Sequence, residues 1–316
     1  MSNKLVPVVL CLIPMLLFSA CGGGQASSGS ASAGKAASSS AASGGGKIQV
    51  SVTFDAMKEF TEAVGKDKVK VTTIIPDGTE PHDFEPKAQD IAGLSTAQVF
   101  VYSGFGMESW AEKAAGAADN KNLITVEASK GAVPIQNTDP DEVKEHGQYD
   151  PHLWISLKGA EIDVKNIRDA LAKADPSDKA CFDQNCDSFV SQLESLYSEY
   201  DKKFQSDKNK SFVTGHAAFA YLCRDFGLNQ NSVEDVFAEG EPSAKKLAEL
   251  VNYCKEKHVK TIFVEDMVSP AVSQTLADQV GAKVEQIYTI ESSEDGKTYL
   301  DRMKANLDEI SASLSK

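Results

Sequence analysis

Hydrophobic and polar positions along the chain follow two periods in turn. Residues 47–54 (KIQVSVTF) alternate with period two, which predicts a strand, and residues 55–65 (DAMKEFTEAVG) have helical spacing that stops at Gly65. The same change of period predicts further strands at 68–76, 98–104 and 122–129 and helices at 86–97 and 107–119. Strands that alternate with helices of this length indicate βαβ units around a parallel sheet.

A much longer helical pattern follows the predicted helix at 163–175, and Pro176 opens it. Its stripe steps by three and four residues through Phe182, Cys186, Phe189, Leu193, Leu196, Tyr197, Tyr200 and Phe204. A helix of this length, about 45 Å, can join two lobes rigidly. Beyond it the alternation returns, with strands at 210–216, 259–266 and 283–290 and helices at 217–227, 243–258, 270–281 and 296–315.

We therefore expect an α/β protein with two lobes, each with a parallel-type β-sheet flanked by helices, joined by one long rigid helix. The predicted boundaries are 47–175 for the N-terminal lobe, 176–208 for the connecting helix and 209–316 for the C-terminal lobe.

The first residues have the features of an exported chain. Lys4 precedes an apolar segment that is shorter than a membrane-spanning helix and contains two prolines. The segment ends at Cys21, after small residues, in an arrangement that resembles a bacterial lipoprotein processing site, although Phe18 stands where Leu is preferred. We expect a signal peptide at 1–20 and lipidation at Cys21; ordinary secretion is the alternative. Residues 21–46 are almost all Gly, Ser and Ala, which predicts a flexible tether.

Net charge and cysteine content limit the partners and the disulfide bonds that the chain can have. The net charge of −14 argues against a nucleic-acid partner and fits a body that attracts cations. Four cysteines lie beyond the signal region: Cys181, Cys186, Cys223 and Cys254. Cys181 and Cys186 are too far apart on a helix to form a disulfide. All four occupy apolar positions, so buried thiols and bridges both remain open.

Three of the five histidines occupy equivalent places. His82, His152 and His216 each lie at or just beyond the carboxyl end of a predicted strand, the edge where open α/β folds bind ligands. Imidazole is the commonest side-chain ligand for zinc and suits other transition metals. Because the three come from both lobes, they predict one metal site between them.

Zinc takes four ligands, so a fourth donor is expected. Glu291, just after the strand at 283–290, is the best candidate, and Glu265, Glu80 or water are alternatives. Neighbouring acidic residues are expected to orient the imidazoles or nearby backbone: Asp83, Glu85 and Asp150. Of the other histidines, His258 is expected at the surface, whereas His146 lies in an acidic loop and could assist in metal capture.

Several segments together resemble a known family. In their residues, order and spacing they resemble the solute-binding lipoproteins of bacterial zinc and manganese ABC transporters. The segments are DGTEPHDFEPKAQDI, QVFVYSGFGMESW, YDPHLWISL, TGHAAFAYLCRDFGL, EGEPSAKKLAELV, KTIFVE and GAKVEQIYTIE. The resemblance implies a metal-type periplasmic-binding-protein fold with His82, His152 and His216 as ligands. It also implies a lipid-anchored monomer on the extracytoplasmic face of the cell membrane that delivers metal to an ABC permease.

The resemblance also bears on which metal is bound. Manganese-type members usually replace the third histidine with Glu and end with Asp in the last loop, whereas this chain has His216 and Glu291. Imidazole-rich sites favour zinc, and manganese prefers oxygen donors. Many zinc-type members carry a long histidine-rich loop, which here is short and acidic. We expect zinc, with a manganese-specific protein of the same family as the alternative.

Two other functional classes remain. Three histidines and a water can form a catalytic zinc site, but the chain has no HExxH motif, and a fourth protein ligand would close the site. We therefore expect no enzyme activity, with a zinc-dependent hydrolase as the rival. A surface adhesin is the other rival, and it would bind host matrix independently of the three histidines.

Overall fold

The structure is a computed structural model that describes residues 46–138, 143–144, 147–238, 242–267 and 269–315. These residues belong to one compact unit, Gly45–Lys316. The predicted signal peptide, Cys21, nearly all of the tether and His146 lie outside the described residues. Within the described ranges, every helix is too short or too polar to cross a membrane.

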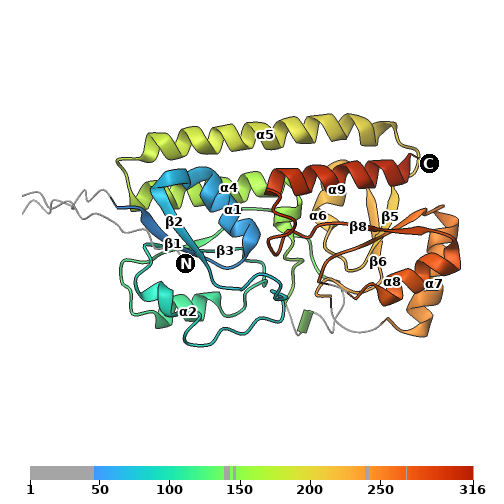
Figure 1. The fold of residues 1–316 in the computed structure, drawn as a ribbon, viewed down its shortest axis with the longest axis horizontal. Helices are drawn as coiled ribbons and strands as arrows, with labels where there is room; N and C mark the ends of the chain where they lie inside the picture. The colour runs from blue at the N-terminus through green and yellow to red at the C-terminus, as the bar shows by residue number, and fades with distance from the viewer. Residues whose placement is uncertain (1–45, 139–142, 145–146, 239–241, 268, 316) are drawn as a thin grey trace, which may run out of the picture. The chain divides into compact units, whose positions relative to one another are not determined.

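The first sheet is parallel, as the strand–helix alternation predicted, with strand order β2-β1-β3-β4 (Figure 1). Helices α1 and α4 cover one face through residues such as Phe60 and Val164, and α2 packs against Phe100 and Tyr102 on the other. The elements are β1 (Ile48–Val52), α1 (Asp55–Gly65), η1 (Lys66–Lys68), β2 (Val69–Thr73), η2 (Ala92–Ser95), β3 (Val99–Tyr102), α2 (Ala111–Ala117), β4 (Ile124–Glu127), η3 (Leu153–Ile155) and α4 (Leu157–Ala174).

The second sheet repeats this arrangement, with parallel strands in the order β6-β5-β7-β8. Val213 and Ile262 face α7 and α8, whereas Phe212 and Phe263 face α6 and α9. The elements are β5 (Ser211–Thr214), α6 (Ala220–Phe226), β6 (Asn229–Ser232), α7 (Ala244–Glu256), β7 (Thr261–Val264), α8 (Pro270–Val280), β8 (Lys283–Gln286) and α9 (Tyr299–Leu314). Each sheet therefore has the reversal of strand order beside which open α/β folds bind ligands at the carboxyl ends of the strands.

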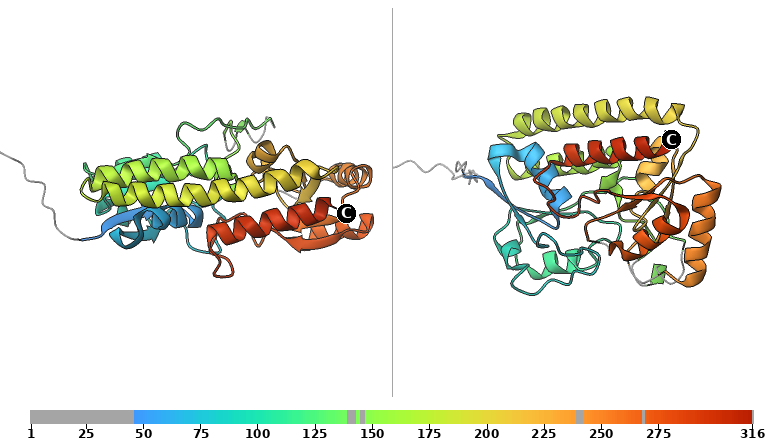
Figure 2. Two further views of the ribbon diagram at one scale, coloured as in Figure 1. Left: turned by 90° about the horizontal axis from the view of Figure 1, so that it is seen from above. Right: turned by 45° about the vertical axis from the view of Figure 1, so that its right-hand side comes forward.

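Helix α5 (Lys179–Ser206) has 28 residues and lies along both halves of the compact unit. It packs on α1 and α4 beside the first sheet and on α6 and α9 beside the second, as Figure 2 shows from above. At 1.5 Å per residue its length is about 42 Å. Phe182 and Phe204, near its two ends, are both fully buried.

Some predicted elements were wrong or had different ends. The helix predicted at 86–97 is only the 3₁₀ turn Ala92–Ser95, because Gly93 interrupts the segment and Asp90 accepts a hydrogen bond from the Lys87 amide. Helix α4 begins six residues earlier than the predicted 163, since the Ser156 hydroxyl caps it at the Gly159 amide. The long helix begins at Lys179 rather than at Pro176, and the predicted helix at 107–119 is shortened to Ala111–Ala117.

The four described cysteines are free thiols, with Cys181 half-buried and the other three buried. This decides the question that the sequence left open in favour of unpaired thiols. Burial raises the pKa of the Cys254 thiol to about 11, so this group stays protonated and uncharged at neutral pH.

Candidate metal centre

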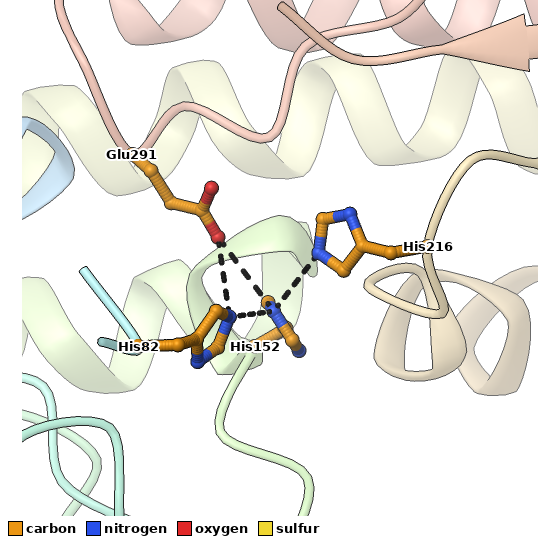
Figure 3. Close-up of side chains that lie close together, drawn as sticks. All are labelled: His82, His152, His216 and Glu291. Atoms are coloured by element: carbon orange, nitrogen blue, oxygen red, sulfur yellow. Dashed lines mark hydrogen bonds and ion pairs between the residues drawn. The ribbon is translucent and has the colours of Figure 1, made fainter. Parts of the chain in front are cut away.

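The structure brings the three predicted histidines and Glu291 together, with their side chains pointing toward one another (Figure 3). His82 comes from the loop after β2, His152 from the residue before η3, His216 from the end of β5 and Glu291 from the segment after β8. One ligand atom from each of the four lies within 4.8 Å of all the others.

The distances within this group match the size of a zinc ion. The Nε2 atom of His152 lies 3.1 Å from Nε2 of His82 and 3.4 Å from Nε2 of His216. Oε1 of Glu291 lies 3.8 Å from Nε2 of His82 and 3.6 Å from Nε2 of His152. Zinc bonds of about 2.0–2.1 Å in a tetrahedron place ligand atoms about 3.4 Å apart. The four side chains can therefore surround one ion with little movement.

Burial explains why this arrangement needs a cation. The side chains of His152, His216 and Glu291 are almost completely buried. Burial, and then the charge of His152, hold the pKa of His216 well below 6.5, so this imidazole is neutral and has a lone pair for a metal. Burial, and then the charge of Glu80, raise the pKa of Glu291 well above its ordinary value. Its Oε1 has no hydrogen-bond partner, a defect that a divalent ion would remove.

Neighbouring side chains orient the candidate ligands. Oδ1 of Asp150 accepts hydrogen bonds from the His152 backbone amide and from Nδ1 of its ring, both at 2.9 Å. The proton is then on Nδ1, and Nε2 presents its lone pair to the centre. The Thr289 hydroxyl donates to Oε2 of Glu291 at 2.8 Å, which leaves Oε1 directed at the imidazoles.

The two alternative carboxylates have other positions. Oε1 of Glu265 accepts from the His216 amide and lies 3.6 Å from Nδ1, on the side of the ring away from the other imidazoles. Glu80 accepts from the backbone amide of His82. Both are therefore placed to support a histidine, and Glu291 is the carboxylate that reaches the shared centre.

The other sequence candidates do not belong to this group of four. Asp83 and Glu85, which we expected to help orient the imidazoles, are exposed. His258 is exposed, as predicted, on the turn after α7.

Several residues that we did not predict from the sequence hold the site together. Trp154 Nε1 donates to the Thr289 carbonyl at 2.8 Å, and the Tyr299 hydroxyl donates to the Trp154 carbonyl at 2.7 Å. Phe237 packs its ring edge-on against His82, with 5.3 Å between ring centroids. Ile290 has a φ of +61°, a strained conformation for a β-branched residue, directly before Glu291. Trp154 and Ile290 lie in the quoted segments YDPHLWISL and GAKVEQIYTIE, but nothing in the sequence pointed to the contacts of Tyr299 and Phe237.

Comparisons with known proteins agree on one family. A family model described as "Zinc-uptake complex component A periplasmic" matches residues 50–313. The chain is 44% identical over 278 residues to a putative metal-binding protein of Treponema pallidum, covering 85% of this chain and 88% of that one. It is 36% identical over 283 residues to the high-affinity zinc uptake system protein ZnuA of Bacillus subtilis, with the same coverage.

A solved structure gives the same result for the fold. The laminin-binding protein Lmb of Streptococcus agalactiae, described as bifunctional with adhesin and metal-transporting activity, superposes with a TM-score of 0.78 at 34% identity. The match covers 85% of this chain and 99% of that one.

Proposed function

The chain belongs to the family of periplasmic A components of zinc-uptake complexes, and on this premise we propose that it captures zinc outside the cell membrane and delivers it to an ABC permease. One observation carries the proposal: three buried imidazoles and a carboxylate oxygen without a hydrogen-bond partner face one point from both halves of the molecule. Such a group costs folding free energy unless a cation occupies it.

His82, His152, His216 and Glu291 are the proposed zinc ligands. Three nitrogen donors and one oxygen donor suit zinc better than manganese, which prefers oxygen. The distances of 3.1 and 3.4 Å between Nε2 atoms support a small tetrahedral ion. A manganese-specific protein of this family is the alternative that the experiment below separates.

We further propose that the chain acts as a lipid-anchored monomer. In this proposal residues 1–20 are a signal peptide, Cys21 carries the lipid, and residues 21–46 are the tether. The proposed lobes are 47–175 and 209–316, joined by 176–208, because one sheet lies on each side of α5 in the sequence. Since α5 packs on helices of both halves, we expect metal binding and release to involve small movements.

The site is proposed to bind metal without catalysis. Four protein donors complete a tetrahedral zinc site and leave no position for a reactive water. In its number of ligands the site thus resembles structural zinc sites. The names of the two relatives above refer to metal binding and zinc uptake.

An adhesin role is a second candidate, because the Streptococcus agalactiae relative is described as having adhesin activity. It requires laminin binding by this chain that persists when His216→Ala removes a proposed ligand. Surface plasmon resonance with immobilised laminin would measure this. Absence of binding by both the unaltered and altered proteins would exclude the role.

The proposed function is tested by calorimetric titration of chelator-stripped protein with zinc and then with manganese. We expect tight one-to-one zinc binding that His216→Ala abolishes or weakens greatly, and no change in His258→Ala, whose exposed imidazole is the matched control. Tighter binding of manganese than of zinc would assign the chain to the manganese branch. Binding of neither metal would refute the proposal.

A further inference from the structure

A buried arginine connects the two halves of the molecule close to Glu291. Arg302, in the first turn of α9, is completely buried. Its Nη2 atom donates to Oδ2 of Asp55 at 2.5 Å and to Oε1 of Glu59, both on α1. Its Nη1 atom donates to the carbonyl of Ser292 at 2.6 Å. We call Arg302, Asp55, Glu59 and the Ser292 carbonyl the interlobe latch.

Burying a guanidinium is costly, and one partner alone rarely compensates for the loss of water. Here two carboxylates and a carbonyl surround the cation. Oε2 of Glu59 also accepts a hydrogen bond from the Tyr299 amide at 2.5 Å, which fixes that carboxylate at the start of α9. The interlobe latch therefore has a defined geometry that is set by both α1 and α9.

The interlobe latch acts on the backbone that carries Glu291. The Glu291 carbonyl accepts from the Asp55 amide at 3.3 Å, and the next carbonyl, of Ser292, is held by Arg302. The Ser292 hydroxyl accepts from the Gly78 amide at 2.7 Å, in the loop that leads to His82. Although Glu291 follows β8 of the second sheet, its backbone is thus fastened to elements of the first.

The strained residue before Glu291 adds to this argument. Ile290 keeps a φ of +61° while fully buried, and such a conformation persists only where neighbouring contacts hold it. The hydrogen bonds to the carbonyls of Glu291 and Ser292 are contacts of that kind. Without them, the backbone can relax, and Oε1 of Glu291 would leave its place 3.6 Å from Nε2 of His152.

We propose that the interlobe latch is a positioning device for the metal site, in which Arg302 acts through Glu291 by holding its backbone against α1. This rests on the proposed function, because it takes Glu291 as a zinc ligand. A cluster that only stabilised the fold would support all four ligands alike. The interlobe latch, in contrast, holds the carbonyls of Glu291 and of the residue after it.

A double-mutant cycle tests this on the full chain purified in detergent. Zinc affinity is measured by competition with a chelator for the unaltered protein, Arg302→Met, Glu291→Gln and the double variant. We expect Arg302→Met to weaken zinc binding by about 10- to 100-fold, as loss of a supporting partner does at other metal sites. In the Glu291→Gln background the same change should alter affinity by less than about twofold.

An equal loss in both backgrounds would overturn the proposal, since Arg302 would then act on the fold and not through Glu291. Arg168→Met is the matched control, because Arg168 pairs with Asp169 and Asp183 on the outer side of α4 and α5. It should leave zinc affinity unchanged. If the unaltered chain binds no zinc, the proposed function itself fails, a result distinct from an additive cycle in a protein that does bind zinc.

Arg302→Met leaves the buried carboxylate of Asp55 and the partly buried carboxylate of Glu59 without their cation, a change that can prevent folding. A triple variant, Asp55→Asn with Glu59→Gln and Arg302→Met, removes all the charges together and avoids that cost. The cycle is then repeated with the triple variant in place of Arg302→Met. A loss of zinc affinity that requires Glu291 supports the interlobe latch, and one that does not require it overturns the proposal.

Discussion

The contact between Asp150 and His152 allows a graded test of the metal centre. One oxygen, Oδ1 of Asp150, accepts both from the His152 amide and from Nδ1 of the ring, each at 2.9 Å. Asp150→Asn keeps an oxygen in this place and removes only the negative charge. Asp150→Ala removes the acceptor as well, so the ring loses both its orientation and the partner that fixes the proton on Nδ1.

The expected effects follow from these differences. Loss of a supporting partner weakens metal binding by about 10- to 100-fold, or about 1.4 to 2.7 kcal/mol. We assign the lower value to Asp150→Asn, which retains the geometry, and the upper value to Asp150→Ala. Asp83→Asn, which neutralises an exposed carboxylate next to His82, should stay within about twofold of the unaltered chain.

The assay is a chelator competition for zinc at constant pH and ionic strength, with thermal unfolding of each metal-free variant to confirm that it folds. If a folded Asp150→Ala protein bound zinc as tightly as the unaltered chain, the reasoning would be refuted. His152 would then be either oriented by other contacts or absent from the ligand set. An equal loss in the Asn and Ala variants would show instead that charge, and not geometry, dominates.

Three further predictions concern pH and packing. Zinc should be released as pH falls from about 7.5 to about 5, because imidazoles must be neutral to coordinate the ion. A zinc affinity, measured by competition, that does not change over this pH range would contradict a three-histidine site. Metal-free protein should become less stable to urea as pH rises from about 6.5 to 8. Burial raises the pKa of Glu265 from 4.5 to about 8, so over this range the folded state keeps a proton that the unfolded state has lost. Equal or greater stability at pH 8 would count against this reasoning. Below pH 6.5 the lowered pKa of His216 acts in the opposite direction. Trp154→Ala should lower the free energy of unfolding, measured with urea, by about 3–5 kcal/mol, because this side chain is fully buried and donates a hydrogen bond to the Thr289 carbonyl. Trp110 is only half-buried, so Trp110→Ala should lower it by less. A loss below about 1 kcal/mol for Trp154→Ala would show that the packing of this side chain is dispensable.

The fold was largely predictable because most strands have a clear apolar signal. The alternation in residues 47–54 and the Val-rich segment at 98–104 led to β1 and β3, which are the central strands of the first sheet. Strand β6 (Asn229–Ser232) was not predicted, since its sequence, NQNS, contains no apolar residue. Its place at the sheet edge, paired with β5 alone, explains why it needs none.

The site was predictable for a different reason. Parallel strands place their carboxyl ends at the same edge, so the position of His216 after β5 could be deduced from secondary structure alone. The residues that orient the ligands could not be deduced in this way. Asp150, Asp83 and Glu85 look alike in sequence, yet only the structure distinguishes the buried Asp150 from the two exposed residues. Arg302 lies far from every candidate ligand in the sequence except Glu291, and its role depends on contacts across the two halves.

The order of the candidate ligands along the chain has a consequence for biosynthesis. His82, His152 and His216 precede Glu291, so more than half of the chain separates the first from the last. A nascent chain that ends before β8 has the three candidate histidine ligands but not Glu291, and it also lacks α9, which completes the packing on α5. Contacts between residues so distant in sequence form late in folding. The complete binding site can therefore exist only after the last segment has folded, and metal capture by all four ligands begins only in the compartment where that final step takes place.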